Sequence, residues 1–129
     1  KLAQGWGKRP TAYFAVTVPY MPNFFMLNGP TGPVGNFPLI DIAERQWGYI
    51  EQLLAKLRSG EARTVEPTAE AHADYEERRV AAAKGTIFAS GCKSWYLDAE
   101  GVPGTWPWGY EAFGEAMRHP RFEDYRIVA

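Results

Sequence analysis

The stretch from Asn23 to Glu44 constrains this chain most, because an apolar run is followed there by a loop rich in glycine and proline and then by a helix start. The run Phe24–Leu27 is too short for a helix and too apolar for a surface, so it predicts a buried strand. The glycines of the loop Asn28–Pro38 allow a ligand to approach the backbone closely. Because the first N–H groups of a helix are free, this order of elements predicts a ligand-binding site.

The helix after this loop has the clearest pattern in the sequence. Apolar residues recur at alternating steps of three and four, which predicts a helix over residues 39–59 that buries them on one face. Thr68 as N-cap and Gly85 as stop predict a second helix over residues 68–84. The predicted buried face of the first helix comprises Ile40, Ala43, Trp47, Ile50, Leu54 and Leu57.

The rest of the chain predicts shorter elements. Thr11–Val18 is rich in β-branched and aromatic residues, which predicts a short strand or extended segment. Lys1–Pro10 has the composition of an irregular segment. Extended segments are expected at Arg63–Glu66, at Ser94–Leu97 and in the tail after Arg121, with a short helix at Tyr110–Arg118. The predicted fold is therefore α/β, mostly helical with a few short strands.

Composition and charge exclude several classes of function. With 129 residues, 46% of them hydrophobic, the chain can form one domain with its own core. The net charge of −1 does not indicate the basic surface that nucleic-acid binding needs. No apolar run approaches the roughly 20 residues of a membrane span. The single Cys92 excludes an internal disulfide and suits a reducing cytoplasm. Lys1–Pro10 has neither a start methionine nor the apolar core of a signal peptide, so we expect a piece of a longer protein.

The spacing of reactive residues gives little support to three kinds of chemistry. His72 and His119 are isolated and Cys92 lacks a partner at ligand spacing, so we expect surface histidines and no zinc site. Lys93 favours the thiolate of Cys92, but a buried core thiol is the preferred interpretation. The loop glycines have neither the spacing of a dinucleotide fingerprint nor the lysine of a P-loop, so the main phosphate-binding turn is expected outside this chain.

Aromatic residues make up 15% of the chain and cluster in its second half. Trp95-Tyr96 and Trp106-Pro107-Trp108 form either a stacking surface for a planar ligand or part of the core. The core is favoured for any single tryptophan, because burial of such large side chains dominates core energetics. Their place in a loop rich in glycine and proline favours binding, since binding groups concentrate in loops. Both interpretations stay open.

Several short motifs follow one another in a fixed order. They are PNFFMLNGP at 22–30, GPVGNFP at 32–38, IAERQ at 42–46, CKSWY at 92–96 and VPG at 102–104, followed by the closing stretch Tyr110–Tyr125. This ordered set resembles the C-terminal third of the FAD- and NADPH-dependent Baeyer–Villiger-type monooxygenases over nearly the whole chain. The family's two Gly-x-Gly-x-x-Gly turns, its fingerprint motif and its catalytic arginine are absent from the sequence.

The resemblance implies the FAD/NAD(P)-binding α/β fold. Residues 11–60 would form a strand, loop and helix that complete the FAD domain, and residues 61–129 would add a helix and an aromatic loop region. The implied cofactors are FAD and NADPH, and a peroxyflavin formed with O2 would oxidise a ketone to an ester or lactone. The implied small-molecule partner is a ketone or other lipophilic substrate. The expected partners are the upstream FAD and NADP domains of the parent chain, without which the 129 residues would be inactive.

The resemblance also implies roles for single residues. Trp95 would contact the nicotinamide nucleotide, and no catalytic residue or metal ligand is assigned. Two alternatives remain: a non-enzymatic module that binds a planar ligand or a partner protein through its aromatic loops, and a flavin monooxygenase that oxygenates nitrogen or sulfur. The positions expected to face the flavin are Asn28, Gly29, Pro30, Asn36, Phe37, Pro38 and Leu39, and those expected in the substrate pocket are Val34, Phe37 and Trp108.

Overall fold

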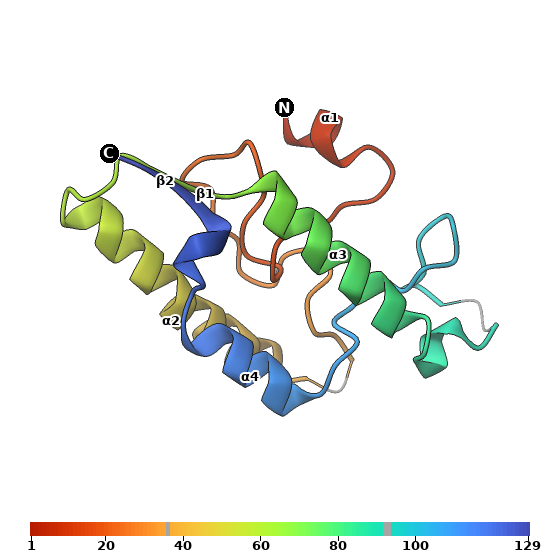
Figure 1. Cartoon of the computed structure of the whole chain (residues 1–129). Coiled ribbons are helices and arrows are strands. Elements are labelled where there is room, and N and C mark those ends of the chain that lie inside the picture. The colour runs from red at the N-terminus through yellow and green to blue at the C-terminus, as the bar shows by residue number, and fades with distance from the viewer. Residues whose placement is uncertain (36, 92–93) are drawn as a thin grey trace.

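A computed structural model describes residues 1–35, 37–91 and 94–129 (Figure 1). Asn36, Cys92 and Lys93, which carry three of the expectations above, lie outside the described residues. The fold is mostly helical with one small sheet, as predicted. In chain order its elements are α1 (Leu2–Trp6), α2 (Leu39–Arg58), β1 (Thr64–Pro67), α3 (Ala69–Ala83), the 3₁₀ helix η1 (Ile87–Ala89), α4 (Tyr110–Arg118), the 3₁₀ helix η2 (Phe122–Asp124) and β2 (Tyr125–Val128).

The three longer helices lie where the sequence predicts them. α2 is followed by Gly60 in the left-handed conformation, with φ of 79°, which glycine adopts without strain. α3 is capped by Thr68, whose Oγ1 accepts the N–H of Ala71 at 3.1 Å. α4 covers the predicted range Tyr110–Arg118. Local patterns and caps therefore determine these boundaries.

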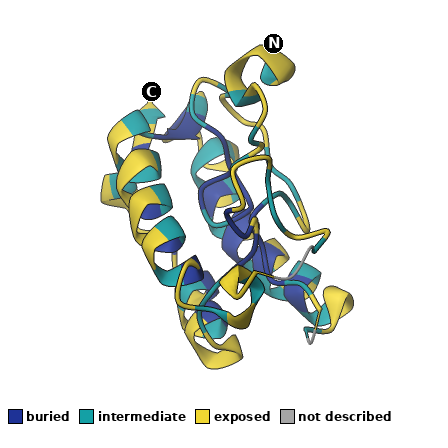
Figure 2. Cartoon of the chain, turned by 90° about the vertical axis from the view of Figure 1, so that its right-hand side faces the viewer, coloured by how far each residue is buried: buried dark blue, intermediate teal, exposed yellow. Residues whose placement is uncertain are grey.

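The buried face of α2 is rotated from the predicted one. The longer helices are buried on one side and exposed on the other (Figure 2). In α2, Trp47 and Ile40 are 46% and 77% exposed, whereas Gln46 and Tyr49 are buried. The prediction was right for Ile50, and Leu54 and Leu57 pack against the core, but it was wrong for Ile40 and Trp47 because it counted only apolar residues. Gln46 Oε1 accepts the N–H of Asn28, and the Tyr49 hydroxyl lies 2.9 Å from that of Tyr125, so both side chains can be buried. The buried residues of α2 are Ile42, Gln46, Tyr49, Ile50 and Leu53.

The sheet joins two segments that are distant in the sequence. β1 and β2 pair antiparallel, with Val65 opposite Ile127 and Pro67 opposite Tyr125. Both extended segments expected here, at Arg63–Glu66 and in the C-terminal tail, are confirmed. The pairing brings the end of the chain back to the connection between α2 and α3 (Figure 1).

The structure contradicts the predictions for the N-terminal segments. Thr11–Val18 is a tight turn in which the N–H of Tyr13 donates to the carbonyl of Thr17 at 2.8 Å, and its apolar residues fill the core rather than a strand. Phe24–Leu27 makes a single bridge, between Phe25 and Thr17, and its Leu27 is 48% exposed. Lys1–Pro10, expected to be irregular, contains the short helix α1.

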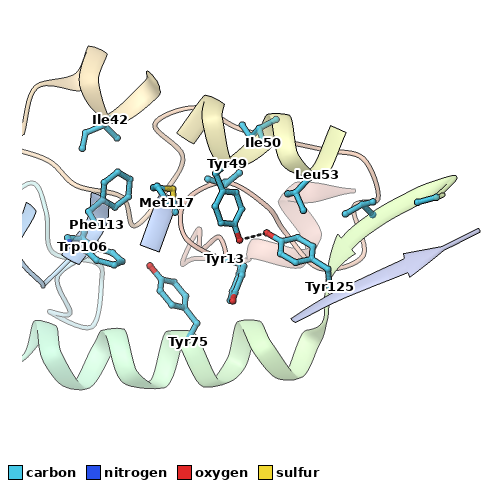
Figure 3. Packing of buried hydrophobic residues seen from close by; sticks show 13 residues of the cluster. Tyr13, Ile42, Tyr49, Ile50, Leu53, Tyr75, Trp106, Phe113, Met117 and Tyr125 are labelled. Atoms are coloured by element: carbon cyan, nitrogen blue, oxygen red, sulfur yellow. Dashed lines mark hydrogen bonds between the residues drawn. The ribbon is translucent and has the colours of Figure 1, made fainter. Parts of the chain in front are cut away.

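The core is built largely from aromatic side chains of distant segments (Figure 3). The hydroxyls of Tyr49 and Tyr125 lie 2.9 Å apart, and Thr17 Oγ1 lies 3.1 Å from the latter. The Tyr13 hydroxyl donates to Asp124 Oδ2 at 2.5 Å. Burial raises the pKa of Tyr125 to about 12, so its hydroxyl stays protonated and hydrogen-bonded inside the core.

Candidate functional site

Two of the three loop glycines serve the chain's own packing. The N–H of Gly29 donates to the carbonyl of Ala15 at 3.2 Å, and a Cβ on Gly29 would overlap that oxygen. A Cβ on Gly32 would lie 3.0 Å from the Cβ of Ala15. Gly35 is exposed, has open space around it and adopts φ of 79°. The close approach expected at Gly29 and Gly32 is therefore made by the turn at residues 13–17, and Gly35 is the glycine that borders open space.

Unusual backbone conformations flank Gly29 and Pro30. Asn28 and Thr31 have φ of 50° and 68°, a region that β-branched residues such as threonine rarely adopt. The N–H of Asn28 donates to Gln46 Oε1 at 2.6 Å, which fastens the loop to α2. Thr31 is buried, and its hydroxyl donates to the carbonyl of Pro30 at 2.5 Å. Such conformations persist only where the surroundings hold them, and they concentrate at functional sites.

The N-terminal end of α2 is open. Pro38 is its N-cap residue and provides no side-chain hydrogen bond to the helix. The first backbone bond of the helix runs from Ile42 to Pro38, at 3.0 Å, so the N–H groups of the first turn have no partner within the helix. Pro38, Leu39 and Ile40 are all exposed. This end of α2 can therefore accept negative charge from a ligand or a neighbouring part of the protein.

A cluster of polar and aromatic side chains joins α4 to the start of α2. Arg45 Nε donates to Asp41 at 2.8 Å, and the Tyr110 hydroxyl donates to the same carboxylate. The guanidinium carbon of Arg45 lies 4.9 Å from the centre of the Tyr110 ring. A Cβ on Gly114 would lie 2.5 Å from Arg45, so glycine makes room for the guanidinium. Phe37, a predicted site residue, packs on Tyr110 with ring centres 5.5 Å apart, which anchors the end of the loop.

An apolar hollow of about 420 Å³ lies beside the start of α2. It brings the predicted residues Asn28 and Leu39 together with side chains from the exposed face of the helix. A contiguous apolar surface of this kind marks a ligand groove or an interface. The hollow is lined by Leu27, Asn28, Leu39, Ile40, Ala43, Glu44 and Trp47.

A second hollow, of about 250 Å³, lies between the loop and the aromatic segment. Pro30 and Thr31 line one part of it, and Trp95 with Tyr96 lines another, so two distant motifs meet there. Trp95 is fully exposed. The strand predicted at Ser94–Leu97 is wrong, because this segment makes only the bridge between Leu97 and Pro103.

The other predicted aromatic residues divide between core and surface. Trp106 is 7% exposed and packs edge-on against the half-buried Trp108, with ring centres 4.6 Å apart. The core interpretation therefore holds for Trp106, whereas Trp95, in the other predicted aromatic cluster, is free to meet a ligand. Val34 is half-buried, and neither Val34 nor Trp108 lines the two hollows described above.

Sequence reasoning missed two buried polar residues that hold the site together. Gln46 supports Asn28 from α2, and its Nε2 is buried without a hydrogen-bond partner in the structure. Arg79 of α3 is 1% exposed, and its Nη1 donates to the carbonyls of Pro103 and Thr105 at 2.8 and 3.1 Å. Gln46 lies four residues after the buried Ile42, and Arg79 lies four residues after the buried Tyr75. Helical spacing could therefore have predicted that both are buried.

The two histidines differ, although both were expected at the surface. His119 is exposed, with its Nδ1 3.0 Å from Gln52 Oε1. His72 is half-buried, its Nε2 lacks a hydrogen-bond partner, and burial lowers its pKa. Within residues 1–35, 37–91 and 94–129, no three His, Cys, Asp or Glu side chains are arranged to hold a metal ion. No helix in these ranges combines the length and apolar character needed to cross a bilayer.

The chain has the fold of a segment of the FAD- and NADP-binding monooxygenases. Cyclohexanone monooxygenase from Rhodococcus sp. Phi1 bound to NADP+ matches with a TM-score of 0.81 and 27% identity, over 99% of this chain and 25% of that protein. An oxidized steroid monooxygenase bound to NADP has the same fold, with a TM-score of 0.84 and 24% identity over 98% of this chain and 24% of that one. No family model matches the sequence.

Curated relatives of the chain are also monooxygenases by name. The uncharacterized monooxygenase Mb0916 of Mycobacterium bovis is 44% identical over 127 residues, which are 96% of this chain and 26% of the relative. The FAD-binding monooxygenase stcW of Emericella nidulans is 30% identical over 132 residues, covering 98% of this chain and 21% of the relative. The chain thus spans about a quarter of the length of the curated relatives it matches.

Proposed function

We propose that this chain is the C-terminal part of an FAD- and NADPH-dependent monooxygenase that oxidises a ketone to an ester or a lactone. The observation that carries the proposal is the match to cyclohexanone monooxygenase, with a TM-score of 0.81 and 27% identity over 99% of this chain. The name of that protein gives a cyclic ketone as substrate, and we extend only that class to this chain. The similarity to FAD-binding monooxygenase stcW supports the choice of cofactor.

The residues around the start of α2 fit the isoalloxazine ring of a flavin. The open helix end provides N–H groups and a positive dipole end for negative charge on the ring. Leu39 is 57% exposed and offers apolar contact, while Asn28 is held in place by Gln46. Gly29 and Pro30 would contribute backbone, because Ala15 occupies the side-chain position of Gly29. When bound, FAD reduced by NADPH supplies the activation of O2, and this chain supplies position and electrostatics.

The exposed face of α2 supports the proposal that residues 11–60 complete an FAD domain. Leu39, Ile40 and Trp47 are 57%, 77% and 46% exposed along the first hollow. Full burial of an aliphatic side chain of this size stabilises by about 1.5–3 kcal/mol, so a covering surface would be strongly favoured. We propose that upstream domains of the longer protein cover this face, and that the 129 residues alone are inactive.

The second hollow supports the assignment of the nicotinamide nucleotide to Trp95. The fully exposed indole can stack on a planar ring, and it lies beside Pro30 of the proposed flavin side. Residues 61–129 would then provide the nucleotide side of the site. Val34, Phe37 and Trp108 remain our proposal for the substrate pocket.

The proposal is tested on the full-length protein that carries this chain. We expect purified protein to absorb in the flavin band and to oxidise NADPH faster when a cyclic ketone is added, with a product heavier by one oxygen atom. Trp95→Ala should weaken NADPH use and raise hydrogen peroxide release. Flavin-free protein that leaves NADPH unoxidised would refute the proposal. Oxygenation of sulfides or amines without ketone oxidation would keep the monooxygenase class and refute the ketone substrate.

A further inference from the structure

Residues 94–105 form a hairpin that is closed by its own hydrogen bonds. The N–H of Asp98 donates to Val102 O at 2.9 Å, and the N–H of Gly104 donates to Tyr96 O at 2.6 Å. Asp98 Oδ1 accepts the N–H groups of Glu100 and Val102 at 2.8 and 2.9 Å. These bonds define the shape of the hairpin, but its position relative to the helices depends on other contacts.

Arg79 of α3 fixes the base of this hairpin. Its Nη1 donates to the carbonyls of Pro103 and Thr105, and its Nε and Nη2 donate to the two carboxylate oxygens of Glu76 at 2.7 and 3.0 Å. The guanidinium thus forms a bidentate pair on one side and holds two backbone carbonyls on the other. Burial of a charge is unfavourable, whereas burial of an apolar side chain is favourable. An apolar residue would therefore serve helix packing better than arginine at this position.

A second anchor, at Arg9, holds the tip of the hairpin. Arg9 pairs with Asp98 and with Glu100, the latter at 2.5 Å. Burial raises the pKa of Asp98, but the N–H groups it accepts and Arg9 lower it by more, so the carboxylate stays charged. The Glu100 side chain is 77% exposed, so its pair contributes little to stability, whereas the Asp98 and Arg9 side chains are 15% and 33% exposed and form a partly buried pair. Arg79, which is 1% exposed, is the more deeply buried of the two anchors.

Trp95 lies on this hairpin and depends on it for its position. The indole is fully exposed, while its neighbour Tyr96 packs edge-on against Phe88, with ring centres 5.4 Å apart. We infer that Arg79 is a positioning residue, which holds Trp95 at the hollow lined by Pro30 and Thr31 and thereby supports binding of a nicotinamide dinucleotide phosphate. This inference rests on the proposed function, in which Trp95 contacts that nucleotide.

The test uses Arg79→Met, Arg79→Ala and Arg79→Lys in the full-length protein. Arg78→Met is the matched control, because Arg78 is the exposed neighbour that pairs only on the surface, with Asp74 at 2.9 Å. Amide hydrogen exchange of residues 94–105 reports whether the hairpin is anchored, and titration with NADP+ reports binding. We expect Arg79→Met to speed exchange in the hairpin and to raise the NADP+ dissociation constant about tenfold, the factor of one hydrogen bond to a charged group.

The NADP+ dissociation constant of Arg79→Lys should lie between those of wild type and Arg79→Met. Lysine keeps the positive charge but lacks the planar guanidinium that donates to several acceptors at once. Flavin content should stay at the wild-type level in all variants. Millimolar guanidinium, far below denaturing concentrations, should restore NADP+ binding to Arg79→Ala but not to Arg79→Met, whose side chain fills the site.

Three results would overturn the inference. The first is faster hairpin exchange with unchanged NADP+ affinity, which leaves the proposed function intact. The second is faster exchange throughout the protein with loss of flavin, which marks Arg79 as a purely structural residue. The third is a wild-type protein that binds neither flavin nor NADP+, which refutes the proposed function and with it the role of Arg79 in nucleotide binding.

Discussion

Replacing Gly29 by alanine separates a role of this glycine in folding from a role in ligand binding. The new Cβ would overlap the carbonyl oxygen of Ala15, which accepts the N–H of Gly29 at 3.2 Å, and would lie 3.3 Å from the Cβ of Met26. Ala15 is 1% exposed and has φ of 61°, so the turn that contains it has little freedom to move away. We expect overpacking of this kind to cost about 1–3 kcal/mol of unfolding free energy.

The same substitution should have the opposite sign at Gly48. This glycine lies inside α2, and a Cβ there would meet no atom within 4 Å. Alanine is favoured over glycine in a helix interior by about 0.8–1 kcal/mol, so Gly48→Ala should stabilise the protein. The comparison holds the chemical change constant and varies only the surroundings of the new methyl group.

Urea unfolding followed by tryptophan fluorescence measures both effects, from the midpoint and slope of each transition. The expected order of stability is Gly48→Ala, wild type, Gly29→Ala. A Gly29→Ala variant as stable as wild type, together with the expected gain for Gly48→Ala, would refute the packing argument. That result would favour the other interpretation of Gly29, in which the missing side chain allows a ligand to approach the backbone closely.

Three further changes test other contacts by the same unfolding measurement. Tyr13→Phe removes the hydrogen bond to the Asp124 carboxylate and should cost about 1.5–3 kcal/mol, the range for hydrogen bonds to charged groups; an unchanged midpoint would show that this bond contributes nothing. Thr68→Ala removes the N-cap of α3 and should cost about 1 kcal/mol, with Thr68→Ser retaining most of the stability. Burial lowers the pKa of His72, so the unfolded state takes up its proton first and stability should fall as the pH drops below about 6.5, the usual histidine value. His72→Gln should flatten this pH dependence and His119→Gln should not; equal slopes in both variants would contradict the assignment.

The sequence predicts elements whose signals are local and misses those that depend on tertiary contacts. α2, α3 and α4 were predictable because periodicity, the Thr68 cap and Gly60 all act within a few residues. The face of α2 was not, because Tyr49 buries its ring only where Tyr125 provides a hydroxyl partner. The segment Thr11–Val18 has the composition of a strand, but a turn that occupies the core selects the same residues.

The candidate site divides in the same way. The resemblance assigned Pro30 to the flavin and Trp95 to the nicotinamide nucleotide, and these roles stay predictions; what the structure adds is that both residues line one hollow. Arg79 escaped notice because its weakly amphipathic helix is rich in charged residues, and only the folded hairpin provides its carbonyl acceptors. A buried arginine is recognised by its partners, and these are distant in the sequence.

Because β1 pairs with β2, residues 68–124 form one long connection that starts at Pro67 and ends at Tyr125, next to each other in the sheet. The entropy of closing a loop changes slowly with its length, by about 0.6 kcal/mol for each doubling. Insertions or deletions at the exposed hairpin tip, residues 99–101, would therefore leave the sheet paired. α2 and the loop before it lie outside this connection. Changes in the length of this tip can thus alter the aromatic side of the proposed site without changing α2, the loop before it, or the contact of that loop with Tyr110.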